Sequence, residues 1–256
     1  MAELIIIGCR AGSPGSCGPA TGFLIEHQAG RILVDCGPGV VAGLANLGLL
    51  ANIDAVIVTH RHADHCSDLV ALAYHRLFPQ RQARIPLYTS ASVHDVVRQL
   101  DQTFGIPSLE ELREPIQQAL EIHTVSIGEP FEVLGLRVET IRTVHPVETM
   151  AIRFPELGFA FSSDAAATPE LVEFVRGSEV LLAEGTYLSG EGRDLSGHGH
   201  MTAACVGDLA RSAAVGRLVV THFSECSERE ATRAVAQEHF QGPVVAAAPN
   251  VRIRLR

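Results

Sequence analysis

The stretch AVIVTHRHADH, residues 55–65, joins a short apolar run to a dense cluster of histidines and an aspartate. The run Ala55 to Val58 is continuous and apolar, which predicts a buried β-strand. Residues 68–78 predict the helix that follows. The cluster from His60 to His65 therefore lies on a loop between a strand and a helix.

The cluster has the donor atoms of a divalent metal site. Imidazole nitrogens and carboxylate oxygens are common ligands of zinc and related ions. We expect His60 and His62 to face one ion, while Asp64 and His65 turn to a second. The alternative is a solvated polar loop, but four ligand-type residues within six positions favour a metal site with two ions.

Three further ligand-type residues each follow a predicted strand. His145 follows residues 136–144, Asp164 follows residues 159–163, and His222 follows residues 218–221. Taken singly, a histidine after a strand is more typical of a cap or a surface position. Together with the cluster, these residues predict the rest of the metal site.

The remaining pattern predicts an α/β fold, an αββα sandwich of two mixed β-sheets with helices on the outer faces. We expect one domain spanning residues 1–256. Further predicted strands cover residues 4–7, 23–26, 31–34, 86–89, 131–133, 151–154 and 180–183, with two more near Val244 and Val251. Further predicted helices cover residues 40–50, 92–104, 169–175, 202–214 and 228–239.

Two local interpretations accompany this outline. Ser92 is a candidate N-cap for the helix over residues 92–104. Residues 106–118 are polar and contain Pro107 and Pro115, so they predict either a loop or a short helix over the site.

Length and charge narrow the class of protein. With 256 residues, 46% of them hydrophobic, the chain can bury a substantial core. The balance of 20 basic and 29 acidic residues gives a net charge of −9 without a basic stripe, so a large polyanion is not the default partner. The N-terminus lacks the pattern of a signal peptide, and no apolar run reaches the roughly 18 residues of a membrane span. These features predict a soluble cytoplasmic protein that does not bind membranes.

Six cysteines are spread along the chain with no C-x-x-C pair. This spacing indicates neither a disulfide framework nor a cysteine zinc site, so we expect reduced structural thiols. Cys66 is singled out because it directly follows the histidine cluster.

The order T-H-x-H-x-D-H, a later histidine, an S-S-D segment at residues 162–164 and a final T-H resembles the metallo-β-lactamase superfamily. The resemblance extends from Gly8 to the C-terminal strands. It implies a site for two metal ions that share one bridging carboxylate. A further aspartate, Asp35, would orient the loop that carries the ligands and would not itself bind metal. The implied ligands are His60, His62 and His145 for the first ion, Asp64, His65 and His222 for the second, and Asp164 as the bridge.

Departures from other branches point to a ribonuclease Z-like branch. True β-lactamases of the common subclass have Cys where Asp164 stands, and the flavodiiron branch has Glu where His62 stands. Glyoxalase II-like thioesterases have the sequence P-G-H-T-x-G around the histidine that corresponds to His145, whereas this chain has VHPVE at residues 144–148. The segment SGHGHMTA, residues 196–203, followed by a helix and VVTHF, residues 219–223, is similar instead to ribonuclease Z.

That similarity aligns the branch's extra catalytic histidine with His200. His198 is the alternative candidate for this catalytic histidine. The long basic arm with which ribonuclease Z grips tRNA has no counterpart here. The segments GCRAGSP (8–14) and ADHCSDL (63–69) are similar to short ribonuclease Z-like proteins, some of which are bacterial cyclic-nucleotide phosphodiesterases. Ser163 and Ala165 depart from the Gly and Thr that the superfamily often has around the bridging aspartate.

The resemblance implies a phosphodiesterase that uses two divalent ions, Zn²⁺ first, with Mn²⁺ or Fe²⁺ as alternatives. A hydroxide activated by the metals would attack a small phosphodiester such as a cyclic nucleotide. Asp64 would accept a proton, and His200 would assist the leaving group. The alternatives are hydrolysis of another ester, thioester or lactone, RNA cleavage, and a metal-binding sensor without turnover. Nucleic acid is a less favoured partner, and a homodimer is compatible with the resemblance.

Overall fold

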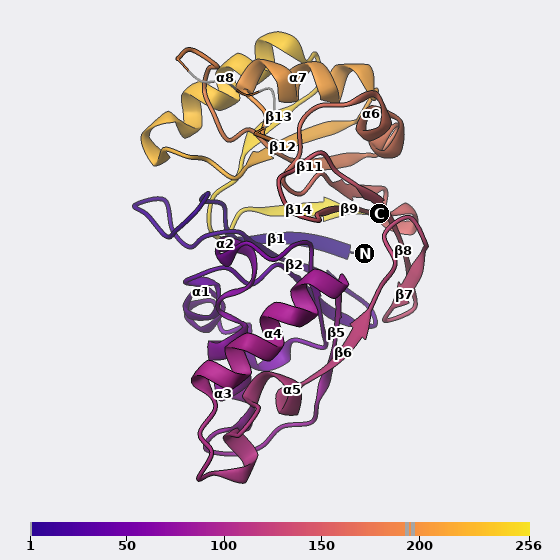
Figure 1. The fold of residues 1–256 in the computed structure, drawn as a ribbon. Helices are drawn as coiled ribbons and strands as arrows, with labels where there is room; N and C mark the ends of the chain where they lie inside the picture. The colour runs from indigo at the N-terminus through magenta and orange to yellow at the C-terminus, as the bar shows by residue number, and fades with distance from the viewer. Residues whose placement is uncertain (1, 193–194, 196–197) are drawn as a thin grey trace.

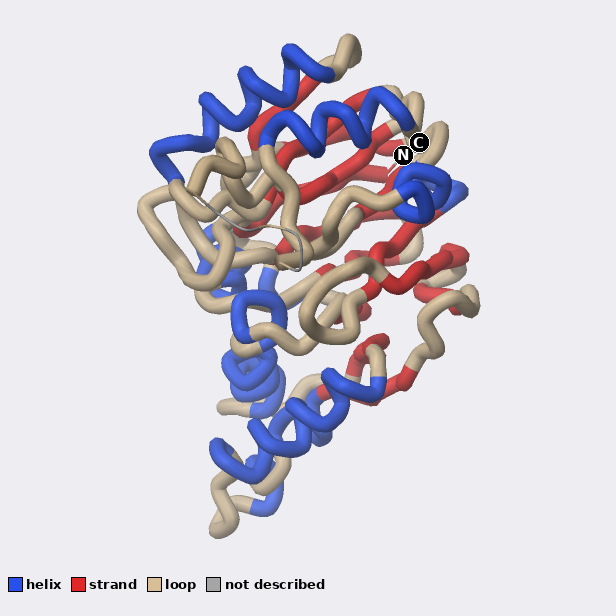
Figure 2. Tube along the Cα trace, turned by 45° about the horizontal axis from the view of Figure 1, so that its top comes forward, coloured by secondary structure: helices blue, strands red, loops and turns tan. Residues whose placement is uncertain are grey.

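Two seven-stranded sheets face one another in the computed structural model, which describes residues 2–192, 195 and 198–256 (Figure 1). Helices cover the outer face of each sheet, so the predicted αββα sandwich is confirmed (Figure 2). The two termini lie near each other because the first and last strands are neighbours in one sheet.

The first sheet has the strand order β14-β1-β2-β3-β4-β5-β6. The strands from β14 to β3 pair antiparallel, and those from β3 to β6 pair parallel. The bounds are β1 (Ala2–Gly8), β2 (Gly22–His27), β3 (Gly30–Val34), β4 (Ala55–Val58), β5 (Ile85–Thr89), β6 (Leu120–Thr124) and β14 (Arg252–Leu255).

The second sheet repeats this plan, with the order β13-β12-β11-β10-β9-β8-β7. Its strands pair antiparallel from β7 to β10 and parallel from β10 to β13. The bounds are β7 (Phe131–Val133), β8 (Leu136–Arg142), β9 (Met150–Phe154), β10 (Phe159–Phe161), β11 (Val180–Glu184), β12 (Arg217–Thr221) and β13 (Val244–Ala246).

The helices form two separate layers. On the outer face of the first sheet lie α1 (Val40–Asn46), α3 (Leu69–Leu77), α4 (Ala91–Phe104) and α5 (Pro115–Ala119), and on that of the second lie α6 (Pro169–Val175), α7 (Ala203–Ser212) and α8 (Arg229–His239). One further turn, α2 (Ala63–Cys66), falls within the histidine cluster. Short 3-10 helices cover Leu50–Asn52, Glu110–Leu112, Pro155–Leu157 and Cys226–Glu228.

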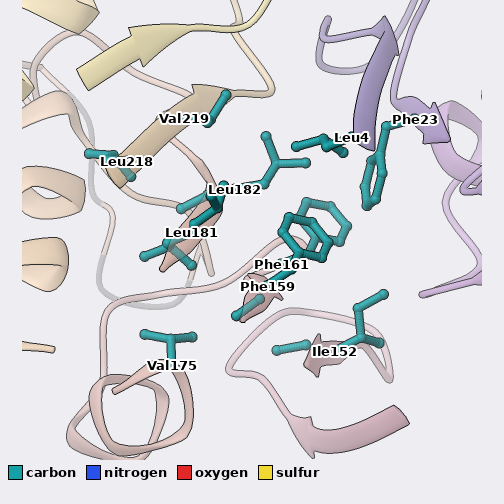
Figure 3. Packing of buried hydrophobic residues seen from close by; sticks show 14 of the residues in the cluster. Leu4, Phe23, Ile152, Phe159, Phe161, Val175, Leu181, Leu182, Leu218 and Val219 are labelled. Atoms are coloured by element: carbon teal, nitrogen blue, oxygen red, sulfur yellow. The ribbon is translucent and has the colours of Figure 1, made fainter. Parts of the chain in front are cut away.

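The core between the sheets is built from large apolar side chains on their facing sides (Figure 3). The ring of Phe23 from β2 packs edge-on against Phe161 at 4.9 Å and Phe159 at 5.9 Å between ring centroids. All three rings are at most 1% exposed. Because burial of a phenyl ring contributes roughly 2–3 kcal/mol, these contacts hold the two halves of the chain together.

Three details differ from the sequence prediction. The edge strand β6 was not predicted, because its Leu120 and Ile122 give too short an alternation to distinguish from a loop. The N-cap of α4 is Ser90, whose backbone is extended, while Ser92 lies inside the helix. Residues 106–118 contain α5 and a 3-10 helix, and α5 contacts α3 and α4 rather than covering the histidine cluster.

Cys17 and Cys226 form a disulfide, so the expectation that all cysteines are reduced is wrong for this pair. Their Cα atoms are 5.4 Å apart, although 209 positions separate them in the sequence. The pairing depends on how the fold brings two loops together, and no local spacing reveals it. Cys66 is free and buried, and burial raises its thiol pKa to about 12, so it is an unreactive thiol rather than a ligand.

No helix among the described residues is long and apolar enough to cross a membrane.

We expect Cys17→Ser to lower the free energy of unfolding by about 2–5 kcal/mol, because a cross-link between distant positions restricts the unfolded chain. Urea unfolding with and without a thiol reductant measures this effect. Cys205→Ser is the matched control, since Cys205 is free and exposed. Equal stability of the Cys17 variant and the oxidised wild type would contradict the prediction.

Candidate metal centre

The seven residues predicted as metal ligands lie together, beyond the carboxyl ends of the central strands. His60 follows β4, Asp164 follows β10 and His222 follows β12. Parallel strands end at the same edge of a sheet, so the ends of β10 and β12 in the second sheet lie together, and the residues after β4 in the first sheet meet them there. Asp35, Ser163 and His222 have φ values of 58°, 52° and 61°, so the chain turns through a left-handed residue after β3, β10 and β12.

Four donor atoms form a first group. The Nδ1 atom of His62 lies 3.1 Å from Nε2 of His60 and 3.1 Å from Nε2 of His145. The Oδ2 atom of Asp164 lies 3.6 Å and 3.8 Å from the same two Nε2 atoms. The side chains of His60, His145 and Asp164 are buried, whereas His62 is half-buried, so the group is open on the side of His62.

A second group forms around the other oxygen of Asp164. Its Oδ1 atom lies 3.4 Å from Nε2 of His65 and 3.5 Å from Nε2 of His222. The two nitrogens are 3.4 Å apart, and Oδ2 of Asp64 lies 3.2 Å from that of His222. The carboxylate of Asp164 therefore faces both groups, one oxygen to each.

These spacings fit divalent ions. Ligand atoms at about 2.0–2.2 Å from a tetrahedral ion are roughly 3.3–3.6 Å from one another. The distances of 3.1–3.8 Å in the first group lie around that range, with nitrogen and carboxylate oxygen as donors. The donor atoms of His60, His62, His145 and Asp164 lie within 4.8 Å of one another, as do those of Asp64, His65 and His222 and those of Asp164, His200 and His222. The donor set and its geometry therefore suit two ions of the zinc type.

Oxygen acceptors behind four of the histidines fix the orientation of their rings. The Nδ1–H of His65 donates to Asp35 at 2.8 Å, and that of His222 donates to the hydroxyl of Thr186 at 2.9 Å. His145 donates to the carbonyl of Gly199 at 3.1 Å, and His60 to Oγ1 of Thr59 at 3.3 Å. When the ring is neutral, each bond leaves the lone pair on Nε2, which is directed into the centre.

The ionisation of these groups is suited to metal binding. Burial lowers the pKa values of His60, His62 and His145, which keeps their imidazoles neutral. Burial alone would raise the pKa values of Asp64 and Asp164, but the surrounding histidines outweigh it and hold both carboxyls ionised. Neutral imidazole and ionised carboxylate are the forms that bind a metal ion.

His65 differs from the other histidines. Burial opposes its protonation, but the charges of Asp164 and Asp35 outweigh burial and raise its pKa well above the ordinary value. Two carboxylates without a metal therefore favour the imidazolium. Binding an ion at this group releases that proton, so the affinity falls as the pH falls.

His200 lies beside the two groups without belonging to the seven. Its ring packs 5.1 Å from that of His145 and 5.4 Å from that of His222, between centroids. Its Nδ1–H donates to Oε1 of Glu184 at 2.9 Å. Burial lowers the pKa of His200, but the hydrogen bond and charge of Glu184 outweigh burial, so the pKa is raised. The residue is therefore suited to hold a proton near neutral pH.

His198 has a different setting. It is exposed, and its ring contacts Tyr187, with 3.3 Å between its Nε2 and the tyrosine hydroxyl. Gly199 between the two histidines has a φ of 69°, and a Cβ there would lie 2.6 Å from the Cα of His145. The close approach that lets Gly199 accept a hydrogen bond from His145 thus requires glycine. Ser196 and Gly197, which belong to the predicted motif, lie outside the described residues.

The sequence reasoning missed Glu184, which is fully buried at the end of β11. Its carboxylate accepts hydrogen bonds from His200, from the backbone N–H of Ala165 at 2.7 Å and from that of Met201 at 3.0 Å. The signal was present, because an acidic residue directly after an apolar strand is the same pattern that identified Asp164.

It also missed Gly12, whose backbone N–H donates to Oδ2 of Asp64 at 2.7 Å. Backbone donors leave no mark in the sequence, so only the fold reveals this contact.

Comparisons with known proteins agree with this site. A family model described as a beta-lactamase superfamily domain matches residues 30–223. The probable metallo-hydrolase YhfI of Bacillus subtilis is 23% identical over 252 residues, which cover 94% of this chain and 95% of that protein. A ribonuclease Z of Nocardia farcinica is 25% identical over 297 residues, covering 99% of this chain and 97% of the enzyme.

Solved structures share the fold. The crystal structure of YhfI from Bacillus subtilis superposes with a TM-score of 0.83 at 22% identity and covers 98% of both chains. A diphosphatase from the PhnP family gives a TM-score of 0.77 at 20% identity, covering 100% of this chain and 98% of the other. The predicted superfamily is therefore confirmed. The chain belongs to the beta-lactamase superfamily and is a metal-dependent hydrolase.

Proposed function

We propose that the protein is a phosphodiesterase that acts on a small phosphodiester, such as a cyclic nucleotide, with two divalent ions, Zn²⁺ first. The first group, His60, His62, His145 and one oxygen of Asp164, would hold one ion. The second group and the other oxygen of Asp164 would hold the second. The observation that carries the proposal is the pairing of this centre with His200, whose Nδ1 is held by the buried Glu184.

Two such ions would activate water and polarise a phosphoryl oxygen. The chain's own residues supply the proton transfers. Asp64 is ionised and oriented by the N–H of Gly12, so its carboxylate can accept a proton as the nucleophile forms. His200 can donate a proton from Nε2 to the departing oxygen, while Glu184 stabilises the imidazolium before transfer.

Phosphorus esters are favoured over other substrates by the names of the relatives. Ribonuclease Z and a diphosphatase both act at phosphorus. A net charge of −9 without a basic stripe favours a compact substrate over a long polyanion.

RNA cleavage is the second candidate, and the similarity to ribonuclease Z along the whole chain is what favours it. It needs a positively charged surface for the nucleic-acid backbone, and the sequence has no basic stripe. A sensor without turnover does not account for His200 and Glu184, which add a proton donor to the ligand set.

The substrate class is tested with bis-p-nitrophenyl phosphate, 3′,5′-cyclic AMP, a thioester, a lactone and a tRNA precursor, each with added Zn²⁺ or Mn²⁺. We expect turnover of the small phosphodiesters, abolished by a chelator and restored by the ion. Turnover of the thioester or lactone alone would refute the proposal. Preferential cleavage of the tRNA precursor would favour the second candidate.

His200→Ala should lower kcat by a factor of about 10² or more, the usual contribution of one acid-base group. Metal content, measured by atomic absorption, should stay at the wild-type level. The control is His198→Ala, which removes an exposed neighbouring histidine. If the two variants exchange these outcomes, His198 is the proton donor; if His200→Ala loses metal, His200 is a ligand.

Glu184→Gln should move the alkaline limb of the kcat profile to lower pH. His200 acts as an acid only while protonated, so activity falls as the pH rises through its pKa. Because Glu184 raises that pKa, removing its charge lowers the pH at which activity is lost. Steady-state kinetics on a chromogenic phosphodiester across the pH range measure the limb. An unmoved limb with a lower plateau would assign Glu184 a structural role only.

A further inference from the structure

Ser163 joins the two halves of the chain at the level of the metal centre. It precedes Asp164 in the second half, and its hydroxyl donates to Oγ1 of Thr59, in the first half, at 2.8 Å. Thr59 in turn precedes His60. Both hydroxyl-bearing residues are 0% exposed, so no water competes for this bond. One hydrogen bond therefore connects the residue before the bridging carboxylate to the residue before the first ligand.

The hydrogen bonds of the Thr59 hydroxyl show that Ser163 is the donor in the Ser163–Thr59 bond. A carboxylate only accepts, so the single proton of the Thr59 hydroxyl goes to Asp35, whose oxygens lie 3.0 Å and 3.1 Å away. The two lone pairs of Oγ1 are then left for Nδ1–H of His60 at 3.3 Å and for the hydroxyl of Ser163. With the Ser163 bond, every hydrogen-bonding position of the Thr59 hydroxyl is filled.

The same connection continues on both sides. Asp35 accepts the Nδ1–H of His65, which sets the direction of a ligand in the second group. On the other side, the carbonyl of Ser163 accepts the hydroxyl of Ser162 at 2.7 Å, and Ser162 accepts the N–H of Glu184 at 3.2 Å. A buried line of hydrogen bonds thus runs from Glu184 through Ser163 to His65.

We propose that Ser163 is a positioning residue whose hydroxyl holds Asp164 in register with the histidines of the first half. Its left-handed backbone, with a φ of 52°, would suit glycine better than serine. The hydroxyl offsets that cost because a buried Thr59 lone pair would otherwise lack a donor. The backbone bond from Met150 to Thr59 also joins the two halves here, but the Ser163 bond is the one that starts from the residue before the shared carboxylate.

This inference rests on the proposed metal site, and metal binding tests it without any assay of activity. Zn²⁺ binding to purified protein is measured by competition with a chromophoric chelator for the wild type, Ser163→Ala and Ser163→Gly. Both variants should bind two equivalents at saturation, with the weaker equivalent bound about 10- to 100-fold less tightly, the usual effect of removing a group behind a ligand. The glycine variant also relieves the backbone, so equal losses in both variants assign the effect to the hydroxyl.

Ser178→Ala is the matched control. Ser178 is 3% exposed, and its hydroxyl has no hydrogen-bond partner among the described residues, so the variant removes a buried hydroxyl without breaking a bond. A double-mutant cycle with Thr59→Val tests the specific contact. In the Thr59→Val background, Ser163→Ala should cause no further loss of affinity, because the acceptor is already absent.

Three outcomes would overturn the inference. The first is that Ser163→Ala binds both equivalents of Zn²⁺ with wild-type affinity. The hydroxyl would then have only a structural role, whatever the melting temperature of the variant. Additive losses in the double variant would place the effect elsewhere than in the Ser163–Thr59 bond. Wild-type protein that binds no Zn²⁺, Mn²⁺ or Co²⁺ would refute the metal site itself, and the proposed function with it. The visible spectrum of the Co²⁺ protein, which should change in Ser163→Ala and not in Ser178→Ala, is an independent readout of ligand geometry.

Discussion

The geometry of the site depends on the hydrogen bonds to one buried carboxylate, that of Asp35. The carboxylate of Asp35 is fully buried, and an ion in that position is tolerated only if donors surround it. Thr59 supplies its backbone N–H at 2.8 Å and its hydroxyl, and His65 supplies Nδ1–H. These donors hold the start and the end of the metal-binding loop at once. The hydrogen bonds that stabilise the buried carboxylate of Asp35 therefore also orient the ring of His65 and fix the backbone before His60.

Much of the fold was predictable because strands and helices in this chain carry strong local signals. The apolar run of β4 and the helix α6 have the predicted bounds, and the motif from His60 to His65 identified the site before any contact was known. Long-range pairings were not predictable. The disulfide of Cys17 depends on loops 209 positions apart, and β14 returns to the first sheet beside β1 although its sequence resembles any edge strand.

The same limit applies within the site. The proposed ligands are histidines and aspartates that come directly after apolar strands, so their residue types and positions identify them in the sequence. Glu184 fits the same pattern, although it was overlooked. The groups that orient ligands include the N–H of Gly12 and the carbonyl of Gly199, which every residue type possesses. Such groups become functional only through their position, and the sequence does not encode position directly. This is why the seven proposed metal ligands could be predicted and much of what orients them could not.

The carboxylate of Asp164 gives the centre a further property. Each of its oxygens faces a different donor group, so the two groups are not independent sites. An ion held by one group fixes the carboxylate plane that the other group needs, and the cost of ordering that side chain is met once rather than twice. By thermodynamic linkage, an ion in one group would change the affinity of the other group by the same factor in either order of binding. In the proposed two-ion centre, a change that moves Asp164 at one group would therefore also change the geometry at the other group.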